Sequence, residues 1–301
     1  MTTLPEIRPT RRFRGASINL MYVPALVLFA VFLIWPVIQG LSLSFTNWDG
    51  MAPSYVNIGL ANYQRLLEDP NFATAMLNTF IFGVGSTIIQ QVMGLFLAVL
   101  LDRTSRVTNA VRSIIYLPVL ISPVVMGAFY YLVFRYNQGA LNDALAAFGV
   151  APVSWLSNSG FAIGVIVFIN SLQFVGISMI IYLAGLQGIP AEVNEASALD
   201  GATGWTQFRY VTWPMLHPAF AASVVINLIG GMKIFDLVRV LTGGGPGYAT
   251  NSVSTLISRT YFGDQAAGYA AAQGVVLFLV IVIFTVVTNA WLDRRATKLG
   301  M

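Results

Sequence analysis

Few side chains in this sequence could carry out covalent or metal chemistry. There is no cysteine and only one histidine, His217, which excludes a cysteine nucleophile and a metal site built from several thiolates or imidazoles. The glycine-rich segment from Gly243 to Gly247 could cradle a phosphate, but no Lys-Ser or Lys-Thr pair follows it and no strand precedes it. The other polar residues form no acid–base pair that indicates an active site. We therefore predict no catalytic residue, no metal and no cofactor bound by this chain.

Neutral amides inside long apolar segments are the next candidates for chemistry, and they are Asn78, Gln90, Gln91, Asn170, Gln173 and Asn227. Asn170 and Gln173 are three residues apart and share one face of a helix. We predict that these two and Asn227 contact a substrate, with hydrogen bonds between helices as the alternative for each amide. Amides suit an uncharged, hydroxyl-rich solute. The absence of ionisable residues near the middle of these segments disfavours a proton- or sodium-coupled transporter.

Lys233 and Asp236 form a charged pair of residues near the end of one apolar segment. Their spacing of three allows them to pair with each other, and substrate contact is the alternative. A phosphorylated substrate would need more cations than this one lysine, which disfavours such a substrate.

The composition is that of a membrane protein. Of 301 residues, 56% are hydrophobic and only 9% are charged, against about 25% charged in a typical soluble domain. The net charge of +4 could suggest a nucleic-acid partner, but the basic residues cluster beside apolar runs, as membrane topology requires. We therefore expect contact with membrane lipid and no nucleic acid.

Six apolar runs are long enough to cross a membrane, which takes about 20 residues. We predict a tail at 1–19, a first transmembrane helix at 20–41, a loop at 42–74, a core at 75–292 with five further helices, and a tail at 293–301. The core helices are expected at about 75–101, 113–134, 161–186, from after Pro218 to about Phe235, and 266–292. The first run is too long for a signal peptide and is followed by no small-residue cleavage site.

Arginine and lysine residues orient these helices. Most of them lie in the two tails and in the connections after the second and fourth helices. The positive-inside tendency places both termini and these connections in the cytoplasm, and the loops at 42–74 and 236–265 outside the cell membrane. The connection at 187–218 departs from this tendency, because Glu192, Glu195 and Asp200 outnumber Arg209.

The connection at 187–218 is predicted to hold two short helices. Pro190 suits a first helical position, Glu192 and Glu195 favour the positive end of a helix, and Gly201 can end the helix. The second helix is expected at 205–213, stopping before Pro214. Such a loop could dock a soluble partner or be an ordinary structured linker, and its residues alone favour neither.

A motif in this loop favours docking. Glu195, Ala196, Gly201, Val211 and Pro214 fall at the spacings of the EAA loop of binding-protein-dependent importer permeases, which this segment resembles. Ser197 stands at the third position of the Glu-Ala-Ala run, where the motif has alanine, and Trp213 replaces a leucine. The resemblance implies that Glu195, Ala196, Ser197, Asp200, Gly201 and Pro214 form an ATPase-coupling loop.

A second segment resembles carbohydrate importers in particular. The run Phe235-Asp236-Leu237-Val238, the run from Leu241 to Gly247, and Tyr261-Phe262 are similar to an external loop of permeases of the maltose, lactose and glycerol-phosphate types. The resemblance implies an all-α integral membrane protein with six transmembrane helices, the type I ABC importer transmembrane fold and a cytoplasmic coupling loop.

That family resemblance also implies the partners. It implies a second permease subunit, a dimer of ATP-binding-cassette ATPases that uses ATP and Mg²⁺, and an extracytoplasmic substrate-binding protein. The expected cargo is a sugar, a di- or oligosaccharide, with glycerol-3-phosphate or another polyol-type solute as the alternative. The chain is then expected to be a transport subunit of the bacterial inner membrane and not an enzyme.

Overall fold

The computed structural model describes residues 22–103 and 105–298, in which the secondary structure is helical apart from one antiparallel bridge between Thr46 and Asn57. Four helices are long and apolar enough to cross a membrane: Val23–Leu43, Pro70–Leu100, Ser159–Gln187 and Ala267–Arg294. Two bent helix pairs bring the number of candidate spans to six if each pair is one span. The all-α membrane fold predicted from the sequence is confirmed.

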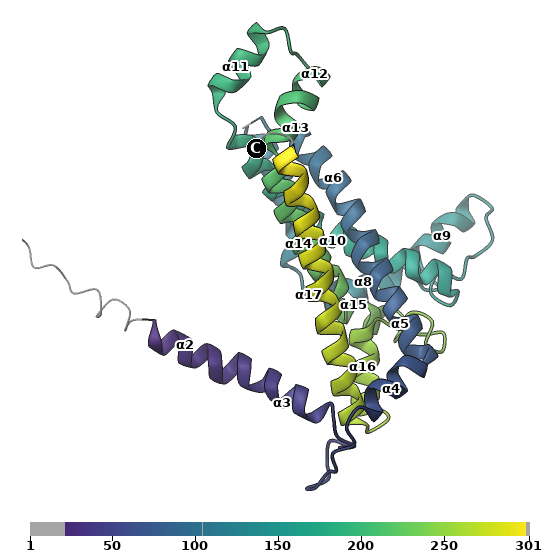
Figure 1. Ribbon diagram of the computed structural model, residues 1–301. Helices are drawn as coiled ribbons and strands as arrows, with labels where there is room; N and C mark the ends of the chain where they lie inside the picture. The colour runs from purple at the N-terminus through teal and green to yellow at the C-terminus, as the bar shows by residue number, and fades with distance from the viewer. Residues whose placement is uncertain (1–21, 104, 299–301) are drawn as a thin grey trace, which may run out of the picture.

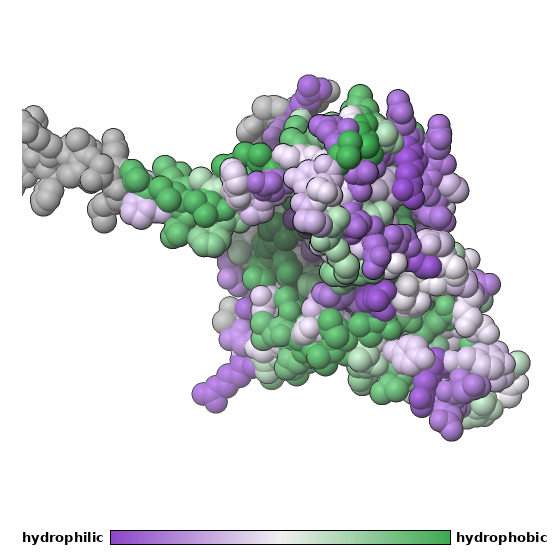
Figure 2. Space-filling view, turned by 90° about the horizontal axis from the view of Figure 1, so that it is seen from below, coloured by the Kyte–Doolittle hydropathy of each residue, from purple (hydrophilic) through white to green (hydrophobic). Residues whose placement is uncertain are grey.

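The first span is an arm that leans away from the other helices (Figure 1). It consists of α2 (Val23–Phe29), the π-helical turn η1 (Ala30–Ile34) and α3 (Trp35–Leu43), and none of their residues is buried. Figure 2 shows its apolar side chains protruding from the body. The arm covers most of the predicted span at 20–41, whereas Leu20 and the predicted tail at 1–19 lie outside the described residues.

The connection between the arm and the body is held in place by hydrogen bonds. Asn62 in α4 (Ala61–Glu68) donates hydrogen bonds of 2.8 Å to the carbonyls of Ser44 and Thr46. The backbone N–H groups of Ala52 and Met51 bond the Asp49 carboxylate and lower its pKa. Because it contains α4, the loop expected at 42–74 is partly helical.

The second span begins earlier than the predicted residue 75. Asp69 accepts hydrogen bonds from the first turn of α5 (Pro70–Phe80), which continues through η2 (Ile81–Gly85) into α6 (Ser86–Leu100). A carboxylate at this position satisfies N–H groups that have no partner within the helix, so the helix can start at Pro70.

The third span is not the single helix predicted at 113–134. Two helices, α7 (Arg106–Leu120) and α8 (Pro123–Phe134), are bent by 98° relative to each other. Ile121 is extended, with ψ at 135°, and Ser122 precedes Pro123. A residue before proline is driven out of the helical conformation and proline supplies no N–H, so a helix ends here although the segment carries no charge.

The fourth span, α10 (Ser159–Gln187), follows the short α9 (Ala140–Ala147) and packs closely on α6. At Gly94 in α6, an added Cβ would lie 2.4 Å from Cβ of Ser178 and 3.1 Å from the backbone N of Met179. This contact is possible only because residue 94 has no side chain.

The remaining helices are α11 (Ala191–Leu199), α12 (Trp205–Gln207), η3 (Phe208–Thr212), α13 (Trp213–Met215), α14 (His217–Met232), α15 (Asp236–Leu241), α16 (Val253–Phe262) and α17 (Ala267–Lys298). The fifth span, α14, stops at Met232 and does not reach Phe235. Helix α17 continues past residue 292 into the predicted tail at 293–301. The predicted loop at 236–265 is mostly the helices α15 and α16.

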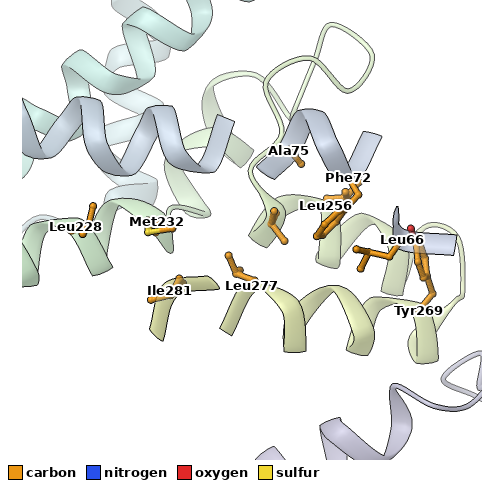
Figure 3. Packing of buried hydrophobic residues seen from close by; sticks show 10 residues of the cluster. Leu66, Phe72, Ala75, Leu228, Met232, Leu256, Tyr269, Leu277 and Ile281 are labelled. Atoms are coloured by element: carbon orange, nitrogen blue, oxygen red, sulfur yellow. The ribbon is translucent and has the colours of Figure 1, made fainter. Parts of the chain in front are cut away.

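The core divides into three clusters. The first joins α4, α5, α14, α16 and α17 and contains Phe72, Met232, Leu256 and Tyr269; Figure 3 shows Phe72 beside Leu256 and Leu66 beside Tyr269. The second surrounds Phe82, Ile166 and Val238. The third contains Ala98, Met179 and Tyr182 and lies where α6, α7, α10 and α14 meet, toward the α11 end of the molecule.

Candidate functional site

The segment between α10 and α14 forms a helical loop at one end of the molecule, opposite α4 and α16 (Figure 1). Its first helix, α11, is preceded by Pro190 as its N-cap residue and ends before Asp200. Gly201 then has a φ of +81° and Gly204 a φ of +56°. Only glycine adopts such angles without steric cost, so the turn between the two helices depends on these residues.

The second helix of this loop does not stop at Pro214 as predicted. The helical backbone runs from Trp205 through α12, η3 and α13 to Met215, and Pro214 lies in the first turn of α13. Proline has no N–H and is usually excluded from a helix interior. Here it directly follows the π-helical turn η3, whose last hydrogen bond runs from the Trp213 N–H to the carbonyl of Phe208. Leu216 then marks a 64° bend into α14.

Most of the predicted coupling residues lie on the surface of α11. Glu195, Ala196, Asp200 and Gly201 are exposed, and the carboxylates of Glu195 and Asp200 take part in no hydrogen bond or ion pair in the part of the chain that the structure describes. Ser197 instead points inward and donates to the carbonyl of Asn194. Leu199 is 89% exposed and Trp205 74% exposed. The loop thus presents unpaired carboxylates beside large apolar side chains that are exposed in the described chain.

Gln173 does not line an open pathway. It is fully buried, and its Nε2 donates a 3.0 Å hydrogen bond to the carbonyl of Ile121, at the bend between α7 and α8. Its Oε1 has no partner among the described residues. The amide therefore satisfies a carbonyl that the broken helix leaves free, which favours a packing role.

Asn170 and Asn227 differ in the hydrogen bonds that their side chains make. Asn227 donates to Ser178 Oγ at 2.6 Å and to Ser223 Oγ at 3.3 Å, and so binds α14 to α10. The backbone carbonyl of Asn170 accepts from Gln90 Nε2 at 3.1 Å, whereas its side chain makes no hydrogen bond within the described residues. Both residues are buried, at 4% exposure for Asn170 and 5% for Asn227. Asn170 therefore remains the pathway candidate with a free side chain.

The other span amides also bond between segments. Asn78 donates to the carbonyls of Ala249 and Asn251, and Gln91 Oε1 accepts from the Tyr182 hydroxyl at 2.6 Å. The Asn78 bonds fix the glycine-rich turn, in which Thr250 also donates to the carbonyl of Gly245. The turn connects α15 to α16 and is braced from within the protein.

Lys233 and Asp236 form no ion pair in the structure as described, so the pairing interpretation is not supported. Lys233 is exposed at the C-terminal end of α14, and Asp236 begins α15. Lys233 lines a mostly apolar cavity of about 420 Å³ between α14 and α17, together with Ile229, Phe278 and Thr285. Among residues 22–103 and 105–298, no group of three or more histidine or acidic residues could hold a metal ion.

Sequence analysis missed a row of four aromatic rings, the aromatic column, formed by Trp205, Phe208, Trp213 and Phe220. The ring centroids are 5.5 Å apart for Trp205 and Phe208, 6.5 Å for Phe208 and Trp213, and 5.3 Å for Trp213 and Phe220. The spacings in sequence follow no single helical period, so no pattern revealed the column. The only signal was the density of aromatic residues in an otherwise exposed loop.

Comparisons with known proteins agree with this geometry. Residues 90–298 match the family described as binding-protein-dependent transport system inner membrane component. A probable starch degradation products transport system permease of Thermoanaerobacterium thermosulfurigenes is 34% identical over 93% of this chain and 95% of its own length. A trehalose/maltose transport system permease of Thermococcus litoralis is 30% identical over 92% of this chain and 94% of its own length.

A solved structure shares the fold. A bacterial alginate ABC transporter, crystallised in complex with an alginate pentasaccharide-bound periplasmic protein, contains a chain that superposes with a TM-score of 0.80 at 24% identity, over 94% of this chain and 96% of that chain. The resemblance drawn from the loop around Glu195 is confirmed, and the chain belongs to the family of inner membrane components of binding-protein-dependent transport systems.

Proposed function

We propose that this permease forms, with a second permease subunit, the pathway of an ATP-driven importer for a neutral di- or oligosaccharide in the bacterial inner membrane. The chain is a transport component of its family and not the enzyme of the system. Relatives that are named for starch degradation products and for trehalose and maltose support the sugar. Asn170, the span amide that remains the pathway candidate, suits such a solute. A partner ATPase is proposed to use ATP and Mg²⁺.

The exposed loop from α11 to α13, the coupling loop, carries this proposal. Glu195 and Asp200 are charged and unpaired in the described chain, and Leu199 and Trp205 are large and exposed. Charged side chains around apolar ones are typical of protein interfaces. The coupling loop is proposed to lie in a cleft of the ATPase dimer, and closure of that dimer moves α10 and α14 between two packings.

The proposed topology places the coupling loop and both termini in the cytoplasm, and α4, α16 and the glycine-rich turn outside. The arginine distribution supports it, because the tails and the connection after α6 are basic. The outer surface is proposed to receive a substrate-binding protein. The exposed apolar arm α2–α3 is proposed to contact lipid and the second permease.

Lys233 supports one alternative cargo. Its ammonium is exposed at the edge of the cavity between α14 and α17, where it could attract a phosphate. Because a phosphorylated substrate would need more cations than this one lysine, glycerol-3-phosphate or a related polyol is the second candidate and the neutral sugar is the first.

The experiment uses the importer as a complex. The cognate binding protein is screened by thermal shift against mono-, di- and oligosaccharides and glycerol-3-phosphate, and the stabilising solute is then tested for uptake in proteoliposomes. We expect a sugar to stabilise the binding protein and to enter only when this permease, its sister and the ATPase are all present. Uptake by this chain alone would refute the proposal, and stabilisation by glycerol-3-phosphate alone would select the alternative cargo.

Topology is tested with single cysteines, since the chain has none of its own. Thr203 and Asp264 are exposed at opposite ends of the helices. A membrane-impermeant maleimide added to intact cells with a permeable outer membrane should label Asp264→Cys and not Thr203→Cys. The reverse labelling would contradict the orientation.

A further inference from the structure

We propose that the aromatic column is the force-bearing link between the coupling loop and α14, with Trp213 as its central positioning residue. The inference rests on the proposed coupling role of the loop. The inference adds which side chains transmit the movement of the loop and names α14 as the helix that receives it.

The two ends of the column lie in different surroundings. Trp205 is 74% exposed at the start of α12, so a partner can press on it. Phe220 in α14 packs against the third core cluster, which includes Ala98 of α6 and Tyr182 of α10. The column therefore leads from an accessible surface to the place where the helices at this end of the molecule meet.

The π-helical turn η3 makes the column continuous. In an α-helix of about 3.6 residues per turn, residues five apart lie about 140° apart around the axis, so the rings of Phe208 and Trp213 would face different directions. The turn η3 spans Phe208–Thr212, and its i to i+5 hydrogen bonding brings residue 213 beneath residue 208.

The column also braces the bend between the coupling loop and α14. The Trp213 and Phe220 rings contact each other across the 64° bend. Leu216, at the bend, is fully buried, and an added Cβ on Gly185 of α10 would lie 2.8 Å from its Cδ2. The bend is thus filled on both sides, so the segment from Trp205 to Met215 moves together with α14.

The first helix of the loop has no comparable connection. Helix α11 reaches the second helix through the turn at Gly201 and Gly204 and through a 3.1 Å hydrogen bond from Gln207 Nε2 to Asn194 Oδ1. Movement of α11 can be absorbed by the turn. Movement of Trp205 passes directly into the Phe208 ring stacked on it and from there into the tilted rings of Trp213 and Phe220, and closely packed rings resist compression.

Residue 213 is one of the two positions, with Ser197, at which this chain departs from the motif that its loop resembles, and the motif has leucine there. A leucine offers no ring to stack between Phe208 and Phe220. The column is therefore a property of this sequence and not of the motif.

The test uses the reconstituted complex of both permeases, the ATPase and the binding protein, with sugar uptake per ATP hydrolysed as the measurement. The double substitution Phe208→Ala/Trp213→Ala breaks all three ring contacts, and from the energies typical of aromatic pairs we expect uptake per ATP to fall about tenfold while the ATPase still co-purifies. Trp213→Leu keeps apolar bulk and should lower the ratio about threefold. Trp213→Phe, which keeps a ring, should stay close to wild type.

Phe96→Ala is the control, because Phe96 is aromatic and 66% exposed, lies in α6 outside the coupling loop and takes part in none of the ring contacts described. Its uptake per ATP should equal that of the wild type. If the double variant does not assemble, the proposal is tested by comparing uptake per ATP between Trp213→Leu and Trp213→Phe. A wild-type ratio for Trp213→Leu, or an equal loss for Phe96→Ala, overturns the proposal. Failure of the wild-type complex to couple ATP to sugar uptake would instead refute the proposed function.

Discussion

Two regions of the molecule differ in whether their side chains find partners within the chain. One is the contact between helices α6 and α10, and the other is the coupling loop. Along the helix contact, Gly94 lies against Ser178, Tyr182 donates to Gln91, and Gln90 donates to the carbonyl of Asn170. In the coupling loop, a Cβ added at Gly201 would meet nothing within 4 Å, and the Glu195 carboxylate has no hydrogen-bond or ion-pair partner in the described structure.

This difference separates stability from coupling. The helix contact is filled by the chain's own atoms, so its residues should determine whether the subunit folds. The coupling loop leaves charged and apolar groups in solvent, so its residues should determine whether another protein acts on the subunit. Substitutions in the two regions should therefore fail in different assays.

The largest effect is expected at Gly94. Gly94→Val places side-chain atoms where Ser178 already lies, at 2.4 Å from the added Cβ, so α6 and α10 must separate at a cost of about 3 kcal/mol. Thermal unfolding of the purified subunit in detergent measures the loss. Gly164→Ala in α10 is the control, because its Cβ would meet nothing within 4 Å; equal melting temperatures for both variants would refute the close packing.

A smaller loss is expected at the bend of the third span. Gln173→Leu removes the hydrogen bond to the Ile121 carbonyl, and a buried carbonyl without a donor costs about 2 kcal/mol. Gln187→Leu, at an exposed position at the end of the same helix, should change little. If Gln173→Leu melts with the wild type, the amide does not stabilise the bend.

The bend also shows what the sequence could and could not predict. Absence of charge predicted a span at 113–134, and Pro123 was visible, but where the helix turned depended on Gln173 in α10 to satisfy Ile121. Similarly, the amides were identifiable as buried polar groups, whereas their partners, such as Ser178 for Asn227, lie on other helices far away in the sequence.

The coupling loop was more predictable because its signals are local. Pro190 and Gly201 mark the ends of α11, and Gly201 does adopt a positive φ. The aromatic column was not predictable, because it requires the π-helical turn at Phe208–Thr212, for which these residues carry no distinct signal.

Glu195→Ala should leave stability within about 0.5 kcal/mol, as is usual for exposed positions. It should lower sugar-stimulated ATP hydrolysis about fivefold, because a charge-assisted contact with the ATPase is lost. Glu195→Gln, which keeps the shape, should show an intermediate loss. A melting temperature that falls together with activity would mean that Glu195 stabilises the subunit and does not couple it.

The smallest effect is expected at Asn170, whose side chain is free of hydrogen bonds in the described chain. If it contacts the sugar during passage, Asn170→Ala should raise the half-saturating sugar concentration for uptake about threefold, the loss of one modest hydrogen bond. Stability should be unaffected. Unchanged uptake kinetics for Asn170→Ala and for its combination with Gln173→Ala would make both amides packing groups.

The central claim, that the coupling loop transfers the work of the ATPase, is tested most directly by Gly201→Asp in the reconstituted complex. The space around Gly201 is open within this chain and its φ is +81°, so the substitution should let the subunit insert and meet the binding protein while obstructing the turn and its fit into the ATPase. Gly201→Ala adds the backbone strain with little bulk, so it should lower sugar uptake less than Gly201→Asp does. We predict that Gly201→Asp abolishes sugar uptake and weakens co-purification of the ATPase, with insertion unchanged; wild-type uptake by a properly inserted Gly201→Asp complex would contradict the account.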